Sequence, residues 1–366
     1  MNRQRFLDAA IGTFVVLSVV ATTGLAQRPA TSSTTSHPSA AEATASIVAA
    51  AQAVLKTLDD AGRAKVQFPF EGPQKTKWSN LPSGIFKREG VRLADLTPAQ
   101  RTAVDRLLST AFSKDGYRKV TEIMRGDEVL RKAEGDGRGG PPGGGGRAGG
   151  RGSGGGVIFG GDEYYLAFLG TPSAASPWML QYGGHHLAIN LTMAGSEATM
   201  APSLPAAQPA TYTFEGRTVR PLGNENDKAF ALINALNDQQ RKQAVLDYRV
   251  SDLVLGPGQD GRTIQPEGIK ASALPAAQQA MLLDLAREWA GIQNEAFAEA
   301  RMAEITANLA ETYFAWSGPT TNGSAAYFRI QGPTLVIEYA PQRGVDHIHT
   351  IYRDPTNDYG AKFTKK

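Results

Sequence analysis

The sequence has no cysteine, almost no charge imbalance and few histidines. Without cysteine, the chain forms no disulfide and has no thiolate zinc site, cysteine nucleophile or cysteine-ligated iron–sulfur cluster. Its 38 Lys and Arg residues stand against 35 Asp and Glu residues, which gives a formal charge of +3. Because nucleic-acid-binding domains are usually strongly basic, this near balance argues against a nucleic-acid partner.

Several catalytic motifs are also absent. The chain has no G-x-S-x-G nucleophile elbow, no Walker A loop and no H-E-x-x-H helix. Its glycine-rich run lacks the strand–loop–helix context that a phosphate-binding loop needs. We therefore predict no nucleotide cofactor.

Only one apolar run stands out, and it lies at the N-terminus. Arg3 and Arg5 precede an apolar stretch at 9–21, and small residues at 24 and 26 precede Gln27. This pattern is typical of a secretory signal, so we expect a signal peptide at 1–26 and an exported protein, periplasmic or secreted. The alternative is an uncleaved anchor, but the run of about 13 residues is shorter than the roughly 20 that a spanning helix needs. No second such run follows, so we expect no membrane span after cleavage.

Two segments have the composition of flexible chain. Residues 27–41 are rich in Ser, Thr, Pro and Ala, which predicts a disordered tether. Residues 135–161 are rich in Gly and Arg, and we expect a flexible loop there because they offer no apolar burial. The prediction is a single α+β domain over 42–366, interrupted by this loop.

Periodicity and capping residues outline that domain. Apolar residues recur at helical spacing from 47 to 58, and Thr97, Pro98 and Gln100 form a strong helix start. Asn237 and Gln240 form a second capping box. Further helices are predicted around 276–290 and 294–313, and strands at 163–169, 178–191, 211–214, 327–330, 334–339 and 347–353. Without regular β-α-β alternation or an evident internal repeat, this order favours a mostly antiparallel sheet flanked by helices.

Histidine is concentrated in two short segments. His37 lies in the tether, and the other four histidines fall at 185–186 and at 347 and 349. Residues two apart on a strand share a face, so His347 and His349 point the same way and could give two imidazoles to one metal ion.

For the adjacent His185 and His186, the question is which of the two is the ligand. If 178–191 is one strand, His185 and His186 point to opposite faces, and His186 shares its face with Asn190. We therefore favour His186 as the ligand and place His185 and Asn190 in the surrounding shell. A bulge at the preceding glycines would reverse the choice.

Three charged residues complete the candidate site. Glu338 interrupts an apolar strand, and a buried carboxylate needs a partner, so we predict it as a fourth ligand with His186, His347 and His349. Arg329 and Arg353 could bind an anionic substrate group. A salt bridge between Glu338 and either arginine is an alternative. For the histidines, acid–base or substrate-binding use without a metal, or structural hydrogen bonding, also remain open.

The chain resembles a known family in several motifs. These are the stretch 165–190 with its Gly-His-His-Leu step, Phe-Ala-Trp-Ser-Gly at 314–318, Tyr-Phe-Arg-Ile at 327–330, Gly332-Pro333, Ile337-Glu338 and the stretch 347–360. Together they resemble the proteins grouped as domain of unknown function 3500, from about residue 47 to the C-terminus. The resemblance implies export from bacteria and a single-domain unit. It implies no particular reaction, and the glycine-rich loop departs from the family pattern.

Two functions fit these observations. The first is an exported metal-dependent hydrolase with one divalent ion, Zn, Mn, Fe or Cu, held by the His/Glu set. The second is a non-catalytic exported protein that binds a small-molecule ligand in the same pocket. The sequence predicts no oligomeric state.

Overall fold

The computed structural model of the chain describes residues 38–134 and 156–364. The predicted signal peptide, the tether up to residue 37 and residues 135–155 of the predicted loop lie outside the described residues. The first helix begins at Ala40, inside the segment predicted as tether, because Ser39 and Glu42 form a capping box there. Within residues 156–161 of the predicted loop, Gly160 is buried and the amide of Ile158 donates to the Ser83 carbonyl.

The helices begin where the sequence places good caps. Both predicted capping boxes, Thr97 with Gln100 and Asn237 with Gln240, are present. The helices are α1 (Ala40–Thr57), α2 (Asp60–Val66), α3 (Pro98–Ala111), α4 (Lys114–Glu134), α5 (Gly223–Ala235), α6 (Asp238–Ala244), α7 (Ala276–Ala290), α8 (Glu295–Ala307) and α9 (Ala361–Thr364).

In the described residues, twelve strands form one mixed, mostly antiparallel sheet, and two more form a separate hairpin. The order across the sheet is β1-β3-β4-β5-β7-β14-β13-β12-β11-β10, with β2 beside β3 and β6 beside β5. The strands are β1 (Gln67–Phe68), β2 (Val91–Arg92), β3 (Tyr165–Leu169), β4 (Trp178–Gly184), β5 (Leu187–Ala194), β6 (Glu197–Thr199), β7 (Ser203–Pro205), β8 (Tyr212–Phe214), β9 (Arg217–Val219), β10 (Ile269–Lys270), β11 (Tyr313–Ser317), β12 (Tyr327–Gly332), β13 (Leu335–Pro341) and β14 (Ile348–Arg353). The predicted α+β fold class is confirmed.

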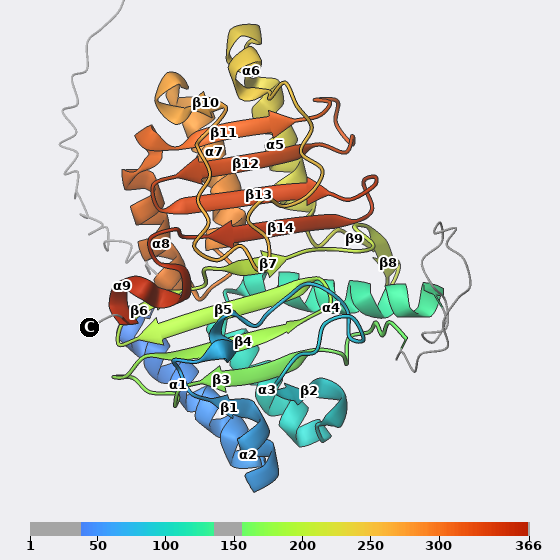
Figure 1. The fold of residues 1–366 in the computed structure, drawn as a ribbon, viewed down its shortest axis with the longest axis vertical. Coiled ribbons are helices and arrows are strands. Elements are labelled where there is room, and N and C mark those ends of the chain that lie inside the picture. Colours follow the sequence, from blue (N-terminus) through green and yellow to red (C-terminus); the bar gives the residue numbers. More distant parts are fainter. Residues whose placement is uncertain (1–37, 135–155, 365–366) are drawn as a thin grey trace, which may run out of the picture. The chain divides into compact units, whose positions relative to one another are not determined.

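The two faces of the sheet are covered differently. The long helices pack on one face, where their apolar sides bury two aromatic-rich clusters against the strands. The chain between β1 and β2 and the chain from 246 to 268 cross the other face (Figure 1). Buried polar side chains lie beneath these two crossing segments, among them Gln181, Asn190, Arg329 and Glu338.

The predicted strand at 178–191 is wrong in one respect that matters for the site. It is a hairpin, β4 and β5, joined by the two-residue turn His185–His186, with Gly184 opposite Leu187. His186 has a φ of 61°, a left-handed conformation that turns allow and strands do not. The alternation of faces assumed for the two histidines therefore does not apply to them.

The fold contains an internal repeat, which contradicts the absence of one inferred from sequence. The order α1-α2-β1, β2-α3-α4, β3-β4-β5 in the first half is repeated by α5-α6, β10-α7-α8, β11-β12-β13 in the second. In both halves a two-residue strand pairs with the first strand of a meander, and the meander's second and third strands are joined by a two-residue turn. In the first half, β1 pairs in parallel with β3. At the equivalent place in the second half, Val245, just after α6, forms an isolated parallel bridge with Trp316 of β11.

Equivalent side chains make equivalent contacts in the two halves. Gln100 Nε2 donates to the Thr57 carbonyl over 2.9 Å, and Gln278 Nε2 donates to the Ala235 carbonyl over 2.7 Å. The first bond connects the start of α3 to the end of α1, and the second connects the start of α7 to the end of α5. The repeat therefore extends beyond topology to side-chain detail.

A glycine marks the same close approach in each half. Gly90 and Gly268 have φ values of 109° and 93°. A Cβ there would lie 2.3 Å from the Leu166 carbonyl oxygen and 2.2 Å from that of Phe314. Only glycine fits either position, because both the conformation and the space exclude a side chain.

The halves meet at the centre of the sheet. β7 pairs with β5 much as β14 pairs with β13, and β7 and β14 are themselves antiparallel neighbours through Ser203 and Tyr352. Two equivalent antiparallel strands side by side imply an approximate two-fold axis through that pair.

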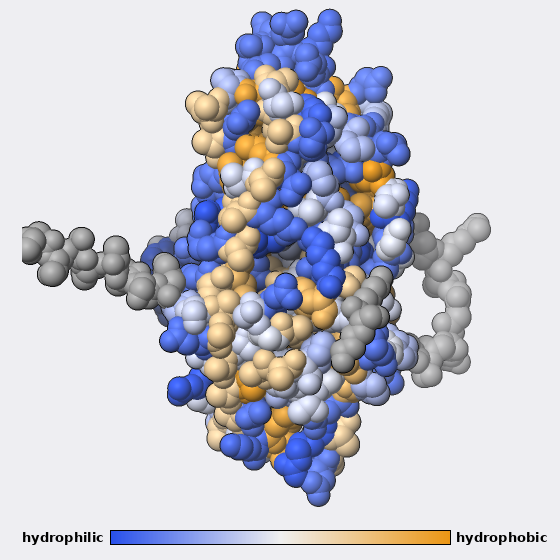
Figure 2. Space-filling model, turned by 90° about the vertical axis from the view of Figure 1, so that its left-hand side faces the viewer, coloured by the Kyte–Doolittle hydropathy of each residue, from blue (hydrophilic) through white to orange (hydrophobic). Residues whose placement is uncertain are grey.

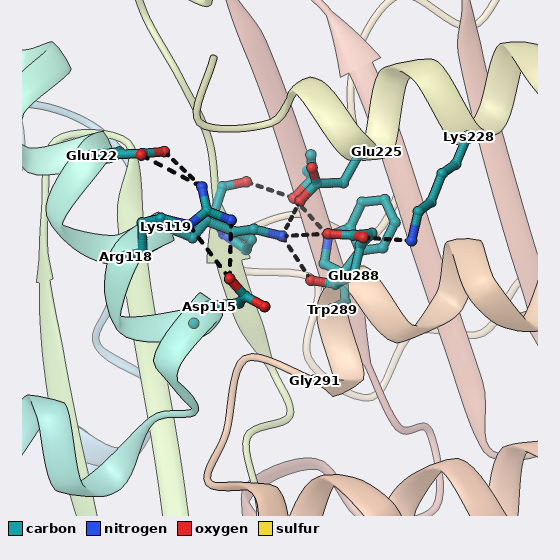
Figure 3. A network of polar contacts seen from close by, with 12 residues as sticks. Asp115, Arg118, Lys119, Glu122, Glu225, Lys228, Glu288, Trp289 and Gly291 are labelled. Carbon is teal, nitrogen blue, oxygen red and sulfur yellow. Dashed lines mark hydrogen bonds and ion pairs between the residues drawn. The ribbon is translucent and has the colours of Figure 1, made fainter. Parts of the chain in front are cut away.

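A buried ion-pair network also joins the halves. Lys119 of α4 contacts Glu225 of α5 and Glu288 of α7, and Lys228 binds Glu288 over 2.7 Å (Figure 3). The side chains of Lys119 and Glu225 are 5% and 0% exposed, so both charges depend on their protein partners.

The side that faces the viewer in Figure 2 presents apolar residues interleaved with hydrophilic ones. None of the helices in the described part of the chain combines the length and apolar character that a membrane crossing requires.

Candidate metal centre

Four histidines meet where the halves join. His185 and His186 form the β4–β5 turn, His347 directly precedes β14, and His349 lies within it. This turn and the start of β14 lie toward the same side of the sheet, on the right in Figure 1. His37 lies outside the described residues. The cluster therefore takes one histidine pair from each half of the fold.

The Nε2 atoms of three histidines converge. His186 Nε2 lies 2.9 Å from His347 Nε2, which lies 2.9 Å from His349 Nε2. Nitrogens that bind one tetrahedral zinc ion at 2.0–2.1 Å are about 3.3 Å apart, so this spacing is within a few tenths of an ångström of a ligand set. His186, His347 and His349, three of the four residues predicted as ligands, are placed so that they could hold a metal ion together.

His186 and His347 are held in the neutral form that binds metals. Burial, followed by the imidazoles of His185, His347 and His349, lowers the pKa of His186 well below its usual value. Burial, followed by His349, lowers the pKa of His347 to about 4. Neither ring carries a proton on both nitrogens at neutral pH, so lone pairs remain for a cation.

Asp252 can orient one of the ligands. Its Oδ1 lies 3.4 Å from His349 Nδ1. An Nδ1–H group held by a carboxylate leaves the lone pair on Nε2, which is the common arrangement behind a metal-binding histidine. His186 differs, because its buried Nδ1 has no hydrogen-bond partner among the described residues.

His185 turns away from the other three and binds an aspartate. Its Nδ1 lies 2.5 Å from Asp127 Oδ1 on α4, and its carbonyl accepts a hydrogen bond from Tyr164 over 2.7 Å. The rings of His185 and His186 stack with centroids 3.6 Å apart. Asp127, His185 and His186 form a second group with ligand atoms within 4.8 Å of one another. Asp127 thus fixes the turn that presents His186.

Asn80 reaches the centre from the segment between β1 and β2. Its carbonyl accepts the backbone N–H of His186 over 3.1 Å, and its side-chain nitrogen lies 3.2 Å from His349 Nε2. Asn80 therefore contacts ligands from both halves.

Arg88 holds Asn80 in place. Its Nη2 donates to the carbonyls of Ser79, Leu81 and Gly184 over 2.8, 2.6 and 2.6 Å. Burial lowers the pKa of Arg88 to about 10, and no acidic side chain in the described ranges forms an ion pair with it. A charge buried on backbone carbonyls alone is costly, which indicates that this connection matters to the local structure.

Glu338 is not part of the histidine group. Its two oxygens accept the backbone N–H groups of Val254 and Leu255 over 2.7 and 2.8 Å. Burial raises its pKa. The sequence correctly indicates a buried carboxylate that needs partners, but those partners are two backbone amides of the 246–268 segment and the Tyr327 hydroxyl, which donates to Oε2 over 2.9 Å. Glu338 thereby anchors the segment that carries Asp252.

Arg329 and Arg353 are also engaged elsewhere. Arg329 binds Glu267 over 2.7 Å, and Arg353 binds Asp260 and Asp358 over 3.0 and 2.8 Å. Glu267 and Asp260 belong to the same crossing segment. The structure does not bring either arginine to the histidines, because both tie this segment to the sheet.

Asn190 occupies the position in the first half that Glu338 occupies in the second. It is fully buried, accepts a hydrogen bond from Gln181 and donates one to the Pro202 carbonyl, each over 2.9 Å. These contacts satisfy it away from the histidines, so the predicted shell role is not supported by its position.

Four residues of the site were missed from sequence: Asn80, Arg88, Asp127 and Asp252. None lies near a histidine along the chain. No residue pattern around them distinguishes them from ordinary loop or helix residues, since only the fold brings them to the site.

Comparison with known proteins gives a family but no relative of known function. No curated protein matches the chain, and no solved structure does. A model of the family described as protein of unknown function (DUF3500) matches residues 40–361. This match spans both halves of the repeat and all four clustered histidines, so the chain belongs to the DUF3500 family.

Proposed function

We propose that the protein binds one divalent metal ion through His186, His347 and His349 and uses it to hydrolyse a substrate outside the cytoplasm. The convergence of three Nε2 atoms at 2.9 Å carries this proposal. The lowered pKa values of His186 and His347 support it, because neutral imidazoles are the ligand form.

Hydrogen bonding alone leaves this cluster poorly satisfied. Each neutral imidazole has one N–H, and His347 Nε2 faces two other Nε2 atoms. If both neighbours donate to it, His349 Nδ1 becomes an acceptor that faces the Asp252 carboxylate oxygen 3.4 Å away. A cation at the common centre instead uses all three Nε2 lone pairs at once.

The donor set favours hydrolysis. Three neutral nitrogens leave the full charge of a divalent ion and at least one coordination position open, which is the pattern of catalytic rather than structural zinc sites. Such an ion supplies a more acidic water and polarises a bound carbonyl or phosphoryl oxygen. Zn, Mn, Fe and Cu are the candidate ions.

The chain's own groups act around this centre. Asp252 holds the His349 ring through Nδ1, and Asp127 holds the turn through His185. His347 and His349 are only partly buried, so a substrate can approach from their side. His186 closes the inner side, because it is 2% exposed.

Elemental analysis of the purified protein tests metal binding. We expect about one equivalent of metal in the parent and in a His37→Ala control, and loss of metal in a His347→Ala/His349→Ala double variant. A parent that stays metal-free after incubation with Zn, Mn, Fe and Cu salts would overturn the proposal.

Hydrolysis is tested on the same proteins with chromogenic carboxylic and phosphoric esters. Activity should disappear with chelator, return with the ion, and be absent from the double variant. A metal-loaded protein that hydrolyses none of them would favour the alternative, a non-catalytic ligand-binding protein.

Export is tested separately. We propose cleavage after Ala26 on the basis of the N-terminal pattern. N-terminal sequencing of the protein recovered outside the cytoplasm should begin at Gln27, whereas a retained N-terminus would contradict the cleavage.

A further inference from the structure

A cleft adjoins the histidine centre on the side of the crossing segment. It has a volume of about 490 Å³ and lies between residues 249–252 and the β13–β14 turn. Asp252 lines it and contacts His349, while Gln342 lines it and donates through its side chain to Asp252 over 2.8 Å. The backbone N–H of Gln342 also donates to the His347 carbonyl over 2.6 Å. Asp252 and Gln342 therefore belong both to the lining of the cleft and to the surroundings of the histidine centre.

The cleft carries an excess of positive charge. Arg249 and Arg343 line it from opposite segments, and both are exposed. Within the described structure, neither forms a hydrogen bond or ion pair through its guanidinium. The only acidic residue lining the cleft is Asp252, which is engaged by Gln342 and His349. Two arginines face one aspartate, so the cleft favours an anion.

Arg343 directly follows Gln342, whose backbone N–H donates to the His347 carbonyl over 2.6 Å, so it extends from the turn that holds this histidine. The backbone of Arg343 has a φ of 54°, a left-handed conformation that a residue with a Cβ adopts less readily than glycine. Strain of this kind gathers at binding and catalytic sites, where the position of a side chain matters.

We propose that this cleft binds a phosphate or sulfate group of the substrate, through Arg249 and Arg343, and so directs the substrate toward the histidine centre. The inference rests on the proposed function for its second part, since the reacting group must reach the metal. Two guanidinium groups from opposite walls suit a tetrahedral oxyanion, which offers acceptors in several directions. A single planar carboxylate needs only one such fork.

Calorimetric titration with inorganic phosphate, and with sulfate, tests the subsite on the full-length protein. The variant combines Arg249→Ala with Arg343→Gly, because glycine keeps the left-handed turn without strain. The control combines Arg106→Ala with Arg217→Ala, which removes the same charge from two other exposed positions. We expect the parent and the control to bind phosphate, and the cleft variant to bind it at least about tenfold more weakly.

Two arms separate this inference from the proposed function. Titrations are repeated after chelator treatment, where the arginine-dependent part of phosphate binding should persist, and the metal content of the cleft variant is measured and should be unchanged. If the protein holds no metal but arginine-dependent binding remains, the hydrolase proposal fails and the subsite stands. No phosphate binding by the parent, or equal binding by the parent and the cleft variant, would overturn the subsite.

Discussion

His186 shows how one residue's conformation can define a site. As a strand residue it would have pointed away from His185, whereas in the left-handed turn it stacks on His185 and contacts His347. The stacking and the burial together exclude water from its inner side. Its pKa is lowered for the same reason, because desolvation disfavours the charged ring.

The lowered pKa values predict a pH effect on the metal-free protein. His347 has a pKa of about 4 in the folded state, against about 6.5 when unfolded. Between these values the unfolded state binds more protons, so the free energy of unfolding falls as the pH drops from about 6.5 toward 4. Urea denaturation in the presence of chelator should show this loss between pH 7 and pH 5.

A His347→Gln variant isolates the effect. Its stability should depend less on pH across that window, whereas a His37→Gln control should follow the parent. Equal losses in the parent and in His347→Gln would show that His347 does not titrate as the structure indicates.

Arg88 contacts no ligand side chain, yet its replacement should weaken metal binding. An Arg88→Met variant frees the turn around Asn80 from Gly184, so both ligand-bearing segments lose a common support. Metal affinity should fall by about 10- to 100-fold, as is typical when residues behind a ligand shell are removed. Competition with a chromogenic chelator measures this.

Lys87→Met is the matched control, because the neighbouring Lys87 side chain is 85% exposed. It should leave the affinity unchanged. If Arg88→Met binds metal as tightly as Lys87→Met, Arg88 does not support the metal site.

At the scale of elements, the sequence was most informative where local chemistry decides the structure. Thr97 with Pro98 and Asn237 with Gln240 start helices through contacts within one turn, so their pattern is sufficient. The histidine turn was missed because turn residues are usually Gly, Asn or Asp, and a His-His pair carries no such signal. The partners of Glu338 were missed because two are backbone amides of a distant segment and the third is the Tyr327 hydroxyl on the neighbouring strand.

The buried ion-pair network between the two halves predicts that the loss of its central lysine strongly lowers stability. Lys119 is buried between Glu225 and Glu288, and burial raises the pKa of Glu225 (Figure 3). A Lys119→Met variant leaves the buried Glu225 carboxylate without its cation, which should cost about 3–5 kcal/mol of unfolding free energy. Denaturant titration gives the value.

Arg118 on the same helix provides the comparison. Its side chain is 48% exposed and pairs with Asp115 and Glu122 on the surface, so Arg118→Ala should cost at most about 1 kcal/mol. Similar losses in the two variants would mean that the buried network contributes no more than a surface pair.

At the scale of the whole molecule, the repeat explains where the site lies. Its halves share helix caps, close-packed glycines and strand register, yet equivalent positions hold different side chains. The turn His185–His186 corresponds to Pro333–Thr334. The repeat is not evident from the sequence, because few residues are identical at equivalent positions of the two halves. In addition, residues 135–155 interrupt only one half. The centre is therefore asymmetric, although the scaffold is nearly symmetric.

Division of the chain after Val219 tests this organisation. The two pieces should associate when they are produced together, because β7 pairs with β14 and Lys119 binds Glu225 across the boundary. Metal binding should require both pieces, since His186 comes from one and His347 from the other. Copurification followed by metal analysis measures both, and a single piece that binds the ion at full affinity would contradict the shared centre.

X-ray absorption spectroscopy of the metal-loaded protein tests the central claim most directly. The account predicts three imidazole nitrogens at about 2.0–2.1 Å from a zinc ion, with an oxygen ligand completing the shell. In the His347→Ala/His349→Ala variant this imidazole signature should vanish. An ion without imidazole ligands, or the same spectrum in both proteins, would contradict the three-histidine centre.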